Sequence, residues 1–428
     1  MEKVRLGFIG VGNRGSQLLQ WSMENTKAEI VALCDVYQPY LERDHGKIDP
    51  RLLEKRNVPK LNEKLPDGVR RYRDFRELLD QKDIDAVVIA SPDHWHAVQT
   101  IMAFRAGKDA FVEKPLTATV YEGRRMVEVE AETGRIGAVC LNRRGSSIYR
   151  ELAERVPAGV IGKVVSSYAS HSSNMYPRGI GKAKPESPPA GFDWDMWLGP
   201  REERPYESTI APYHFRWRSD FSSQMGNWGV HYMDVIRWLS GERAPSSVVA
   251  VGGRYAVDDD RDIPDTLTVL FEFESGRTVQ FQVNEASGGY NIPGGEVELR
   301  GTKGTLIADQ NGYSITPARP GQFQDWEKLV EPEEKKLGGD KAYGDLGIKE
   351  NSSAILIDNF LDCVRDRSVK PYCSLEDAHR STSFAHLANI SLAVGERLRW
   401  DADAERFTNN EQANEMLHYE YRAPWSLE

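Results

Sequence analysis

Apolar runs that end in polar or glycine residues recur through the first third of the chain, and predicted helices separate them. The runs predict five strands, at residues 4–9, 30–35, 85–90, 109–112 and 137–141. Strands that alternate with helices are typical of an α/β unit. The pattern therefore predicts a doubly wound parallel sheet over residues 1–144.

The pattern changes at about residue 145. A helix at residues 147–156 and a strand at 163–170 are expected first. Five more strands then follow without long helices between them, at residues 246–252, 266–273, 278–283, 296–301 and 304–307. Helices at 352–365 and 375–397 close the pattern, and Pro424 and Trp425 indicate a tail that docks. Residues 145–428 are thus expected to form an α+β domain on a largely antiparallel open sheet.

Two long segments interrupt these elements. Residues 47–67 are charged and punctuated by proline, which predicts a surface insertion without a chemical role. Residues 174–224 are rich in proline, glycine and aromatic residues, including Trp194, Trp197, Tyr206, Tyr213, His214 and Trp217. Aromatic faces suit sugar rings, and the same residues can form a hydrophobic cluster that fixes the loop. We expect this loop to do some of each.

The first predicted strand leads directly into a G-x-G-x-x-G turn formed by Gly10, Gly12 and Gly15. The first glycine permits the tight turn from strand to helix, and the second lets the backbone approach a pyrophosphate. The third lets the helix pack closely on the strand, so that its N-terminal amides face the anion. This turn predicts a dinucleotide site.

Asp35 strengthens that prediction, because it ends the second strand about 20 residues after the turn, where an acid that binds ribose is expected. An acid at this position favours NAD. The 2′-phosphate of NADP would meet its negative charge, and Asn13 and Arg14 beside the turn could offset only part of that repulsion. NADP is therefore the less favoured cofactor.

Further candidates follow the later strands, at the edge of a parallel sheet where ligands bind. The loop after residues 85–90 offers four possible cofactor contacts, Ser91, Pro92, His94 and His96. A His-x-His sequence can bind a metal, but no suitably spaced carboxylate or cysteine supports a metal site here. The strand at 109–112 is followed by Glu113 and Lys114 of a Glu-Lys-Pro sequence, which are further candidate cofactor contacts. The strand at 137–141 is followed by Asn142, an expected cofactor contact, and Arg143, an expected substrate contact. A lysine at this edge is either catalytic or a solvated strand end.

The 428 residues suggest two domains, and 65 acidic against 55 basic residues give a net charge of −10. This balance offers no general attraction for nucleic acid or an anionic membrane, so small molecules or other proteins are the expected partners. Cys34, Cys140, Cys363 and Cys373 are scattered, which predicts reduced thiols. Met1 leads almost directly into the first strand, and no stretch reaches the length of a membrane span, so we expect a cytoplasmic protein.

In combination, these motifs resemble those of the Gfo/Idh/MocA oxidoreductases over most of the chain, which implies a Rossmann domain. Residues 226–234, Gly-Asn-Trp-Gly-Val-His-Tyr-Met-Asp, look like the family's Asp-x-Gly-x-His-x-x-Asp helix. In the family the lysine of Glu-Lys-Pro and this histidine face the substrate carbon, which implies these roles for Lys114 and His231. Asn227 stands where the family has aspartate. It removes that carboxylate from any proton relay, but its amide can still hydrogen-bond a substrate hydroxyl.

Oxidation of a secondary alcohol by NAD requires a base that takes the hydroxyl proton while the hydride leaves. Burial and the positive nicotinamide both disfavour the ammonium form of Lys114, and His231 ordinarily titrates near neutral pH. We expect the two to flank the reacting hydroxyl, one as proton acceptor and the other as donor. Asp234, one helical turn after His231, either orients its ring or stabilises local packing. The expected substrate contacts are Lys114, Arg143, Tyr176, Trp194, Tyr213, His214, Asn227 and His231.

The sequence thus predicts an NAD-dependent oxidoreductase acting on a secondary hydroxyl of a sugar, glycoside or cyclitol. The alternative is a redox-neutral glycosidase, in which oxidation at C3 acidifies the C2 proton and permits elimination, hydration and return of the hydride. Its additional acid or base would be Tyr176, Tyr213 or His214. A third possibility is a non-catalytic NAD-binding protein. The exposed face of the second sheet predicts a homo-oligomer, a dimer or a tetramer.

Overall fold

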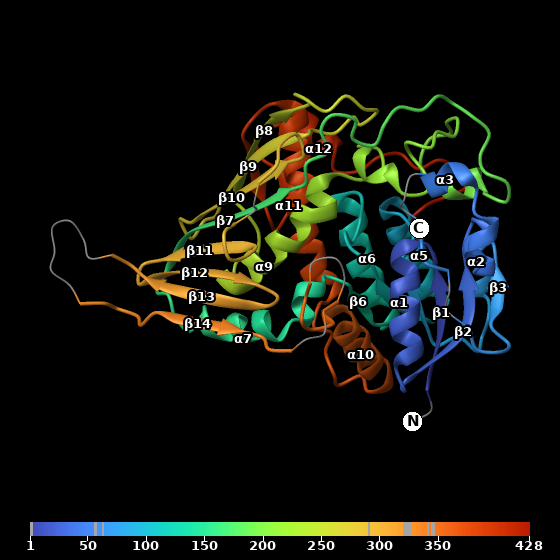
Figure 1. Ribbon diagram of the computed structural model, residues 1–428, viewed down its shortest axis with the longest axis horizontal. Coiled ribbons are helices and arrows are strands. Elements are labelled where there is room, and N and C mark those ends of the chain that lie inside the picture. Colours follow the sequence, from blue (N-terminus) through green and yellow to red (C-terminus); the bar gives the residue numbers. More distant parts are fainter. Residues whose placement is uncertain are drawn as a thin grey trace.

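The computed structural model describes residues 3–54, 58–61, 64–289, 292–319, 327–339, 342–343 and 347–428. Two sheets organise the chain, and Figure 1 shows them at opposite ends of the molecule with helices between them. The fold class expected from the sequence is confirmed.

The first sheet is parallel, in the order β3-β2-β1-β4-β5-β6. Its strands are β1 (Val4–Ile9), β2 (Ala28–Cys34), β3 (Arg70–Tyr72), β4 (Ala86–Ile89), β5 (Asp109–Val112) and β6 (Gly137–Val139). The strand order reverses between β1 and β4, and in such sheets a ligand binds beyond the carboxyl ends of the strands at that point. The glycine turn after β1 and the loop after β4 therefore meet at one site.

Helices cover both faces of the first sheet. They are α1 (Asn13–Glu24), α2 (Gln38–Glu42), α3 (Pro50–Glu54), α4 (Phe75–Leu79), α5 (His96–Arg105) and α6 (Val120–Thr133). Leu18 of α1 packs on one face together with Phe360 of α10 (Ser352–Arg365), while Phe104 of α5 and Met126 of α6 pack on the other. Because β4 and β5 are buried on both faces, each reads as a continuous apolar run.

The second sheet has ten strands in the order β14-β13-β12-β11-β7-β10-β9-β8-β15-β16, antiparallel except where β7 meets β10. They are β7 (Val164–Ser172), β8 (Ser247–Gly253), β9 (Thr266–Glu272), β10 (Thr278–Asn284), β11 (Val297–Gly301), β12 (Gly304–Asp309), β13 (Gly312–Pro317), β14 (Glu333–Lys336), β15 (Leu398–Asp401) and β16 (Arg406–Phe407). Helices α7 (Ser147–Arg155), α9 (Val230–Ser240) and α11 (Leu375–Val394) pack on one face. Short helix α12 (Glu411–Glu415) adds Ala413 to this core, whereas α8 (Trp194–Leu198) packs in the core of the first sheet.

The five strands expected between residues 246 and 307 are confirmed to within two residues as β8 to β12, whereas β3 and β13 to β16 were not predicted. Helix α11 ends at Val394, three residues earlier than expected, because Gly395 adopts φ 71° and caps it. The segment at residues 47–67 falls partly outside the described residues, at 55–57 and 62–63. Its Leu52 and Leu61 are only 3% and 7% exposed and pack in the first core, so the expectation of a surface insertion was wrong there.

All four cysteines are buried free thiols. In the described ranges, no helix has both the length and the apolar character needed to cross a bilayer.

Candidate active site

The turn between β1 and α1 has the backbone that a dinucleotide cradle requires. Gly10 adopts φ +84°, and a Cβ on Gly15 would lie 2.0 Å from the Gly10 carbonyl oxygen, so neither position accepts a side chain without movement. Gly12 is the N-cap of α1 and supplies no side chain to bond the first-turn amides. Those amides and the helix dipole are thus suited to a pyrophosphate, as the sequence predicts.

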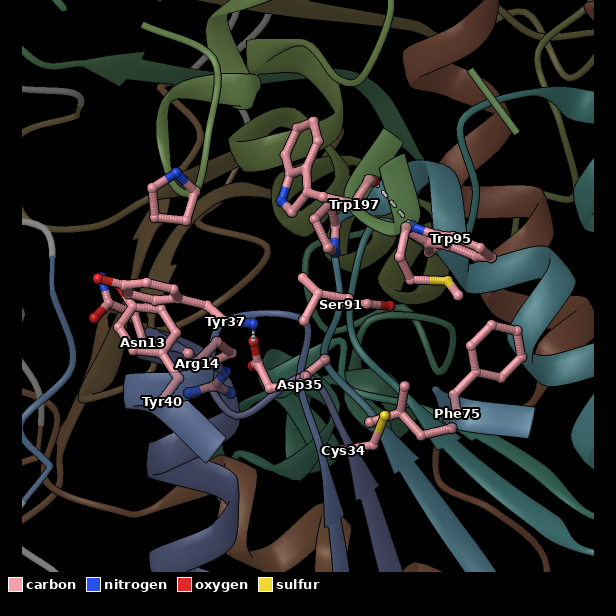
Figure 2. A pocket seen from close by; sticks show the side chains of 18 of the residues that line it. Asn13, Arg14, Cys34, Asp35, Tyr37, Tyr40, Phe75, Ser91, Trp95 and Trp197 are labelled. Carbon is pink, nitrogen blue, oxygen red and sulfur yellow. Dashed lines mark hydrogen bonds between the residues drawn. The ribbon is translucent and has the colours of Figure 1, made fainter. Parts of the chain in front are cut away.

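Asp35 lies beside this turn, and both line the cavity that Figure 2 shows. Its Oδ2 accepts a 2.8 Å hydrogen bond from the Val11 amide, and its Oδ1 accepts one of 2.9 Å from the Tyr37 amide. Burial raises the pKa of Asp35 to about 6, against the opposing effects of these amides and of Arg43. The carboxylate is held in place with lone pairs left for ribose hydroxyls.

Arg14 lines the cavity, as a cofactor contact should, and its guanidinium is also bonded to neighbouring side chains. Its Nε donates to Oε1 of Glu113 at 2.6 Å, and its Nη2 donates to Oγ of Ser353 in α10. The guanidinium therefore connects the glycine turn to the Glu-Lys-Pro sequence, and Glu113 holds its pKa above the usual range against the effect of burial. With its charge committed to Glu113, Arg14 does not offset the repulsion between Asp35 and a 2′-phosphate.

Figure 2 shows the cavity next to the glycine turn, which is the candidate cofactor site. The first sheet supplies its floor through the glycine turn, Asp35, Phe75, Ser91 and Trp95. Its roof comes from the aromatic loop, through Phe192, Met196, Trp197, Pro212, Tyr213, Phe215 and Arg216. The apolar walls and the polar glycine turn together fit a dinucleotide.

The roof is hydrogen-bonded to the floor on the Asp35 side. The Gln38 amide donates to the Gly191 carbonyl at 3.0 Å, and the Asp193 amide donates to the Val36 carbonyl at 2.9 Å. The chain terminus reinforces the far side, where Trp425 packs edge-on against Trp95 with ring centroids 4.7 Å apart. The expected docking of the tail is confirmed.

The two histidines of the loop after β4 do not line the cavity, so their expected cofactor contacts were wrong. His94 is fully buried between Trp197 and Phe221, and its Nε2 donates to the Trp197 carbonyl at 2.9 Å. Burial lowers the pKa of His94 to about 3. His96 lies with its ring nitrogens 2.8 and 2.9 Å from the Pro115 and Ser91 carbonyl oxygens. Ser91 and Pro92 do line the cavity, as expected.

Lys114 and Asn227 are brought together, as the motif implied. Asn227 lies in a π-helical turn, Met225–Gly229, that opens α9. Nζ of Lys114 donates to the backbone oxygen of Asn227 at 2.7 Å and to its Oδ1 at 2.9 Å. Burial lowers the pKa of Lys114 to about 8; Glu113 and Asp93 oppose this effect, and the nearby arginines add to it. A lysine with this pKa can exchange a proton near neutral pH.

His231, the second residue of α9, shares this site. It is buried, and its Nδ1 has no hydrogen-bond partner in the described residues. Burial holds its pKa well below the ordinary value, and the positive charges of Arg143 and Lys114 lower it further. His231 is thus a neutral imidazole that can orient a hydroxyl.

His171 at the end of β7 is a site residue that the sequence analysis missed. Its ring stacks on Trp228 at 4.5 Å with an interplanar angle of 11°. Burial and the charges of Lys114 and Arg143 lower its pKa to about 4. Extending the strand alternation of Ser167 and Ala169 by two residues would have placed His171 on the same buried face.

Two charged residues near His231, Arg143 and Asp234, each form an ion pair with another residue. Nη2 of Arg143 donates to Glu296, the residue before β11, at 2.6 Å, and its Nη1 donates to Oδ1 of Asn142 at 3.1 Å. The expected substrate contact of Arg143 and cofactor contact of Asn142 stay predictions. Asp234 accepts hydrogen bonds from Arg144 at 2.8 to 3.1 Å, which assigns it to local packing rather than to orienting His231.

The aromatic loop divides into cavity wall and support. Tyr213 lines the cavity, whereas Trp194 stacks on Trp197 at 5.0 Å and donates to the Arg204 carbonyl. His214 Nδ1 lies 3.1 Å from the Ser208 carbonyl oxygen, and Tyr176 is 60% exposed. Neither these two residues nor Trp194 lines the cavity. Arg216, which does, was not singled out from the sequence.

Three family profiles match the chain. "Oxidoreductase family, NAD-binding Rossmann fold" matches residues 4–140, "GFO/IDH/MocA C-terminal domain" matches 197–307, and "Oxidoreductase family, C-terminal alpha/beta domain" matches 350–427. Among curated proteins, "Glycosyl hydrolase family 109 protein 1" of Shewanella sp. (strain ANA-3) is 34% identical over 176 residues, which are 40% of this chain and 35% of that protein. "Alpha-N-acetylgalactosaminidase" of Shewanella oneidensis is 36% identical over 135 residues, 31% of this chain and 27% of that protein. The match spans only about a third of these relatives.

Solved structures share the fold at low identity. The aldose-aldose oxidoreductase of Caulobacter crescentus, complexed with glycerol, superimposes with a TM-score of 0.64 at 16% identity, over 93% of this chain and 100% of that one. The WlbA dehydrogenase of Bordetella pertussis, in complex with NADH and UDP-GlcNAcA, gives 0.64 at 19% identity, over 94% and 99%. Together with the three profiles, these matches show that the chain belongs to the Gfo/Idh/MocA family of oxidoreductases with an NAD-binding Rossmann fold.

Proposed function

We propose that this protein transfers a hydride between NAD and a secondary hydroxyl of a sugar, a glycoside or a cyclitol. One observation carries the proposal. A buried lysine with a pKa lowered to about 8 shares a site with the neutral imidazoles of His171 and His231, beside a cavity that fits NAD. This combination provides proton exchange and hydroxyl orientation where the cofactor would accept a hydride.

The role we propose for each residue follows from its position in the site. The glycine turn and Asp35 would hold the pyrophosphate and ribose of NAD, which supplies the hydride acceptor when bound. Lys114 exchanges the hydroxyl proton, and His231 hydrogen-bonds the substrate. The apolar roof excludes water, which strengthens the electrostatic interactions at the reacting atoms.

The test is turnover by the purified protein with NAD and a panel of sugars, aryl glycosides and cyclitols. We expect NADH to accumulate with at least one of them, and Lys114→Ala and His231→Ala to lower the rate at least about 100-fold. Lys47→Ala, a change of an exposed lysine, is the matched control and should leave the rate unchanged. Near-normal rates in both site variants would contradict the proposal.

A redox-neutral glycosidase is the second candidate, and the hydrogen-bonded roof favours it. A cofactor enclosed by residues 191–193 and by the tail exchanges slowly, which suits a reaction that returns the hydride in each cycle. Of the three proposed acids or bases, only Tyr213 lines the cavity. Release of an aglycone with deuterium exchange at C2 and no net NADH would support this candidate. Net NADH with an intact glycoside would exclude it.

A non-catalytic NAD-binding protein is the remaining alternative. The site argues against it, because titratable groups with strongly shifted pKa values, such as Lys114, cluster at functional sites. Tight NAD binding without turnover or isotope exchange across the panel would favour this alternative.

We further propose a homo-oligomer formed through the face of the second sheet that points away from its helices. Strand register places Val249, Leu270, Gln280, Tyr168, Glu298 and Ile307 in one row across six strands. Leu270 is 38% exposed and Val251, nearby on the same face, is 67% exposed. Light scattering should therefore give a dimer or tetramer, and Leu270→Glu should shift it towards monomer. A monomeric wild-type protein at micromolar concentration would contradict this.

A further inference from the structure

We propose that Asn227 is a positioning residue that presents Lys114 as an oriented neutral amine, so that Lys114, and not His231, accepts the proton of the substrate hydroxyl. The inference rests on the hydride transfer proposed above. It concerns the one position in the motif at residues 226–234 where this chain has an amide in place of the carboxylate usual in its family.

The contact between the two residues has two points of attachment. Both the backbone oxygen and Oδ1 of Asn227 accept from Nζ of Lys114, at 2.7 and 2.9 Å. A neutral amine has two N–H bonds and one lone pair. If each N–H donates to one oxygen of Asn227, the tetrahedral nitrogen has a fixed direction for its lone pair. The lysine is then oriented as a base, although its side chain is long and flexible.

The amide oxygen supports the amine because it carries no full charge. A carboxylate at the same distance would stabilise the ammonium form and raise the lysine pKa by about 1 to 3. The π-helical turn contributes as well, because it places the backbone oxygen and the side chain of one residue against the same nitrogen. Asparagine at this position thus combines orientation with charge neutrality.

The other charged groups around Lys114 come from four elements. Burial and the positive charges of Arg216 and Arg14 favour the amine, while Glu113 and Asp93 favour the ammonium. Glu113 already forms the ion pair with Arg14. Asp93 is 6% exposed, accepts a hydrogen bond from Ser222, and has a pKa raised by burial, which weakens its effect. An added carboxylate at residue 227 would change this balance.

His231 is a poor competitor for the proton. Its pKa is held well below the ordinary value by burial and by neighbouring cations, and His171 is neutral for the same reasons. In the proposed step, the hydride leaves carbon for the nicotinamide, the O–H bond breaks, and its proton joins Nζ of Lys114. The products are a carbonyl, NADH and a lysine ammonium, so atoms and charge balance. The new third N–H can donate to the carbonyl oxygen.

The central test is Asn227→Asp in the NAD-loaded protein, read in two ways. The first is the pH dependence of acetylation of Lys114, measured by mass spectrometry, which needs no substrate. The apparent pKa of Lys114 should rise by about 1 to 3, so that its amine fraction at pH 7 falls about 10- to 1000-fold. The second is the pH profile of kcat/KM for oxidation, which should shift upward by the same amount.

Controls separate this inference from the proposed function. Asn409→Asp makes the same chemical change at an exposed asparagine that bonds Arg397 and Arg399, and should move neither readout. If no substrate is oxidised, the proposed function fails while the acetylation readout still tests Lys114. An unchanged lysine pKa in Asn227→Asp overturns the inference, as does a raised pKa with an unshifted kcat/KM profile.

A measurement on the wild-type protein covers the case in which the variant does not fold. Carbon-13 NMR of labelled lysine side chains should show one resonance, absent in Lys114→Arg, that titrates near pH 8. A Lys114 resonance that titrates near the ordinary lysine value of about 10.4 overturns the inference.

Discussion

Binding of NAD is expected to weaken as the pH falls through 6, because Asp35 then becomes protonated. Each oxygen of this carboxylate already accepts one backbone amide, from Val11 and Tyr37, and needs its remaining lone pairs for ribose hydroxyls. Protonation adds an O–H to one oxygen and removes acceptor capacity. Loss of the charge also weakens every hydrogen bond that the group accepts.

The magnitude follows from the pKa of about 6 that burial gives Asp35 in the free protein. At pH 7 about nine tenths of the carboxyl is ionised, and at pH 5 only about one tenth. If NAD binds the ionised form alone, its Kd should rise about tenfold between pH 7 and pH 5, about 1.4 kcal/mol of binding free energy. A carboxyl with the ordinary pKa of about 3.9 would leave Kd nearly constant over this range.

Isothermal titration calorimetry with NAD from pH 5 to pH 8 measures this directly. Asp35→Asn should bind more weakly at pH 7 and lose the pH dependence, because the amide does not titrate in this range. Asp85→Asn, which changes an exposed carboxylate that accepts a hydrogen bond from the Arg5 amide, is the matched control and should keep the wild-type profile. A Kd that stays flat between pH 5 and pH 7 in the wild-type protein would refute the reasoning, and so would a slope that persists in Asp35→Asn.

Three further predictions concern the frame around the site. Asp234→Asn should lower the free energy of unfolding by about 1.5 to 3 kcal/mol in chemical denaturation, because the buried Arg144 loses its buried carboxylate partner and keeps the more exposed Asp377, 3.3 Å away; a loss under 1 kcal/mol would contradict this. Trp425→Ala should speed NAD release in stopped-flow fluorescence, since the ring supports Trp95 in the cavity wall; an unchanged release rate would argue against a role for the tail. Gly15→Ala should abolish measurable NAD binding, because its methyl group meets a carbonyl oxygen at 2.0 Å, and binding within tenfold of wild type would show that the turn can adjust.

The sequence predicted most of the fold because its signals there are local. Strands β4 and β5 are buried on both faces and stand out as apolar runs between glycines and charged residues. Strand β14 has the sequence Glu-Glu-Lys-Lys and lies at the edge of its sheet, where it pairs with β13 and forms ion pairs with α7 through Glu333 and Lys335. No hydrophobic alternation marks such a strand, so periodicity could not find it.

The site residues likewise divide into those with a local sequence signal and those without one. Lys114 and Asn227 were found because each lies in a short motif, and the structure places them in contact. His171 was missed because its relation to Trp228 depends on how β7 meets α9, which no local pattern records. His94 was misplaced because the loop after β4 turns through a 3₁₀ helix, Asp93–Trp95, which leaves Trp95 rather than His94 in the wall of the cavity.

The Trp197 carbonyl connects the loop after β4 to the aromatic loop that forms the roof of the cavity. This oxygen accepts from His94 Nε2 at 2.9 Å and from Trp95 Nε1 at 3.0 Å, so the loop after β4 is fixed to the roof rather than to the cofactor. Opening the cavity on that side must break both bonds and separate the aromatic rings packed around them. We therefore expect His94, which the sequence placed at the cofactor, to slow exchange of the cofactor by holding this contact closed. The choice between a dehydrogenase, which must release NADH, and a glycosidase, which need not, therefore depends on how readily this contact opens.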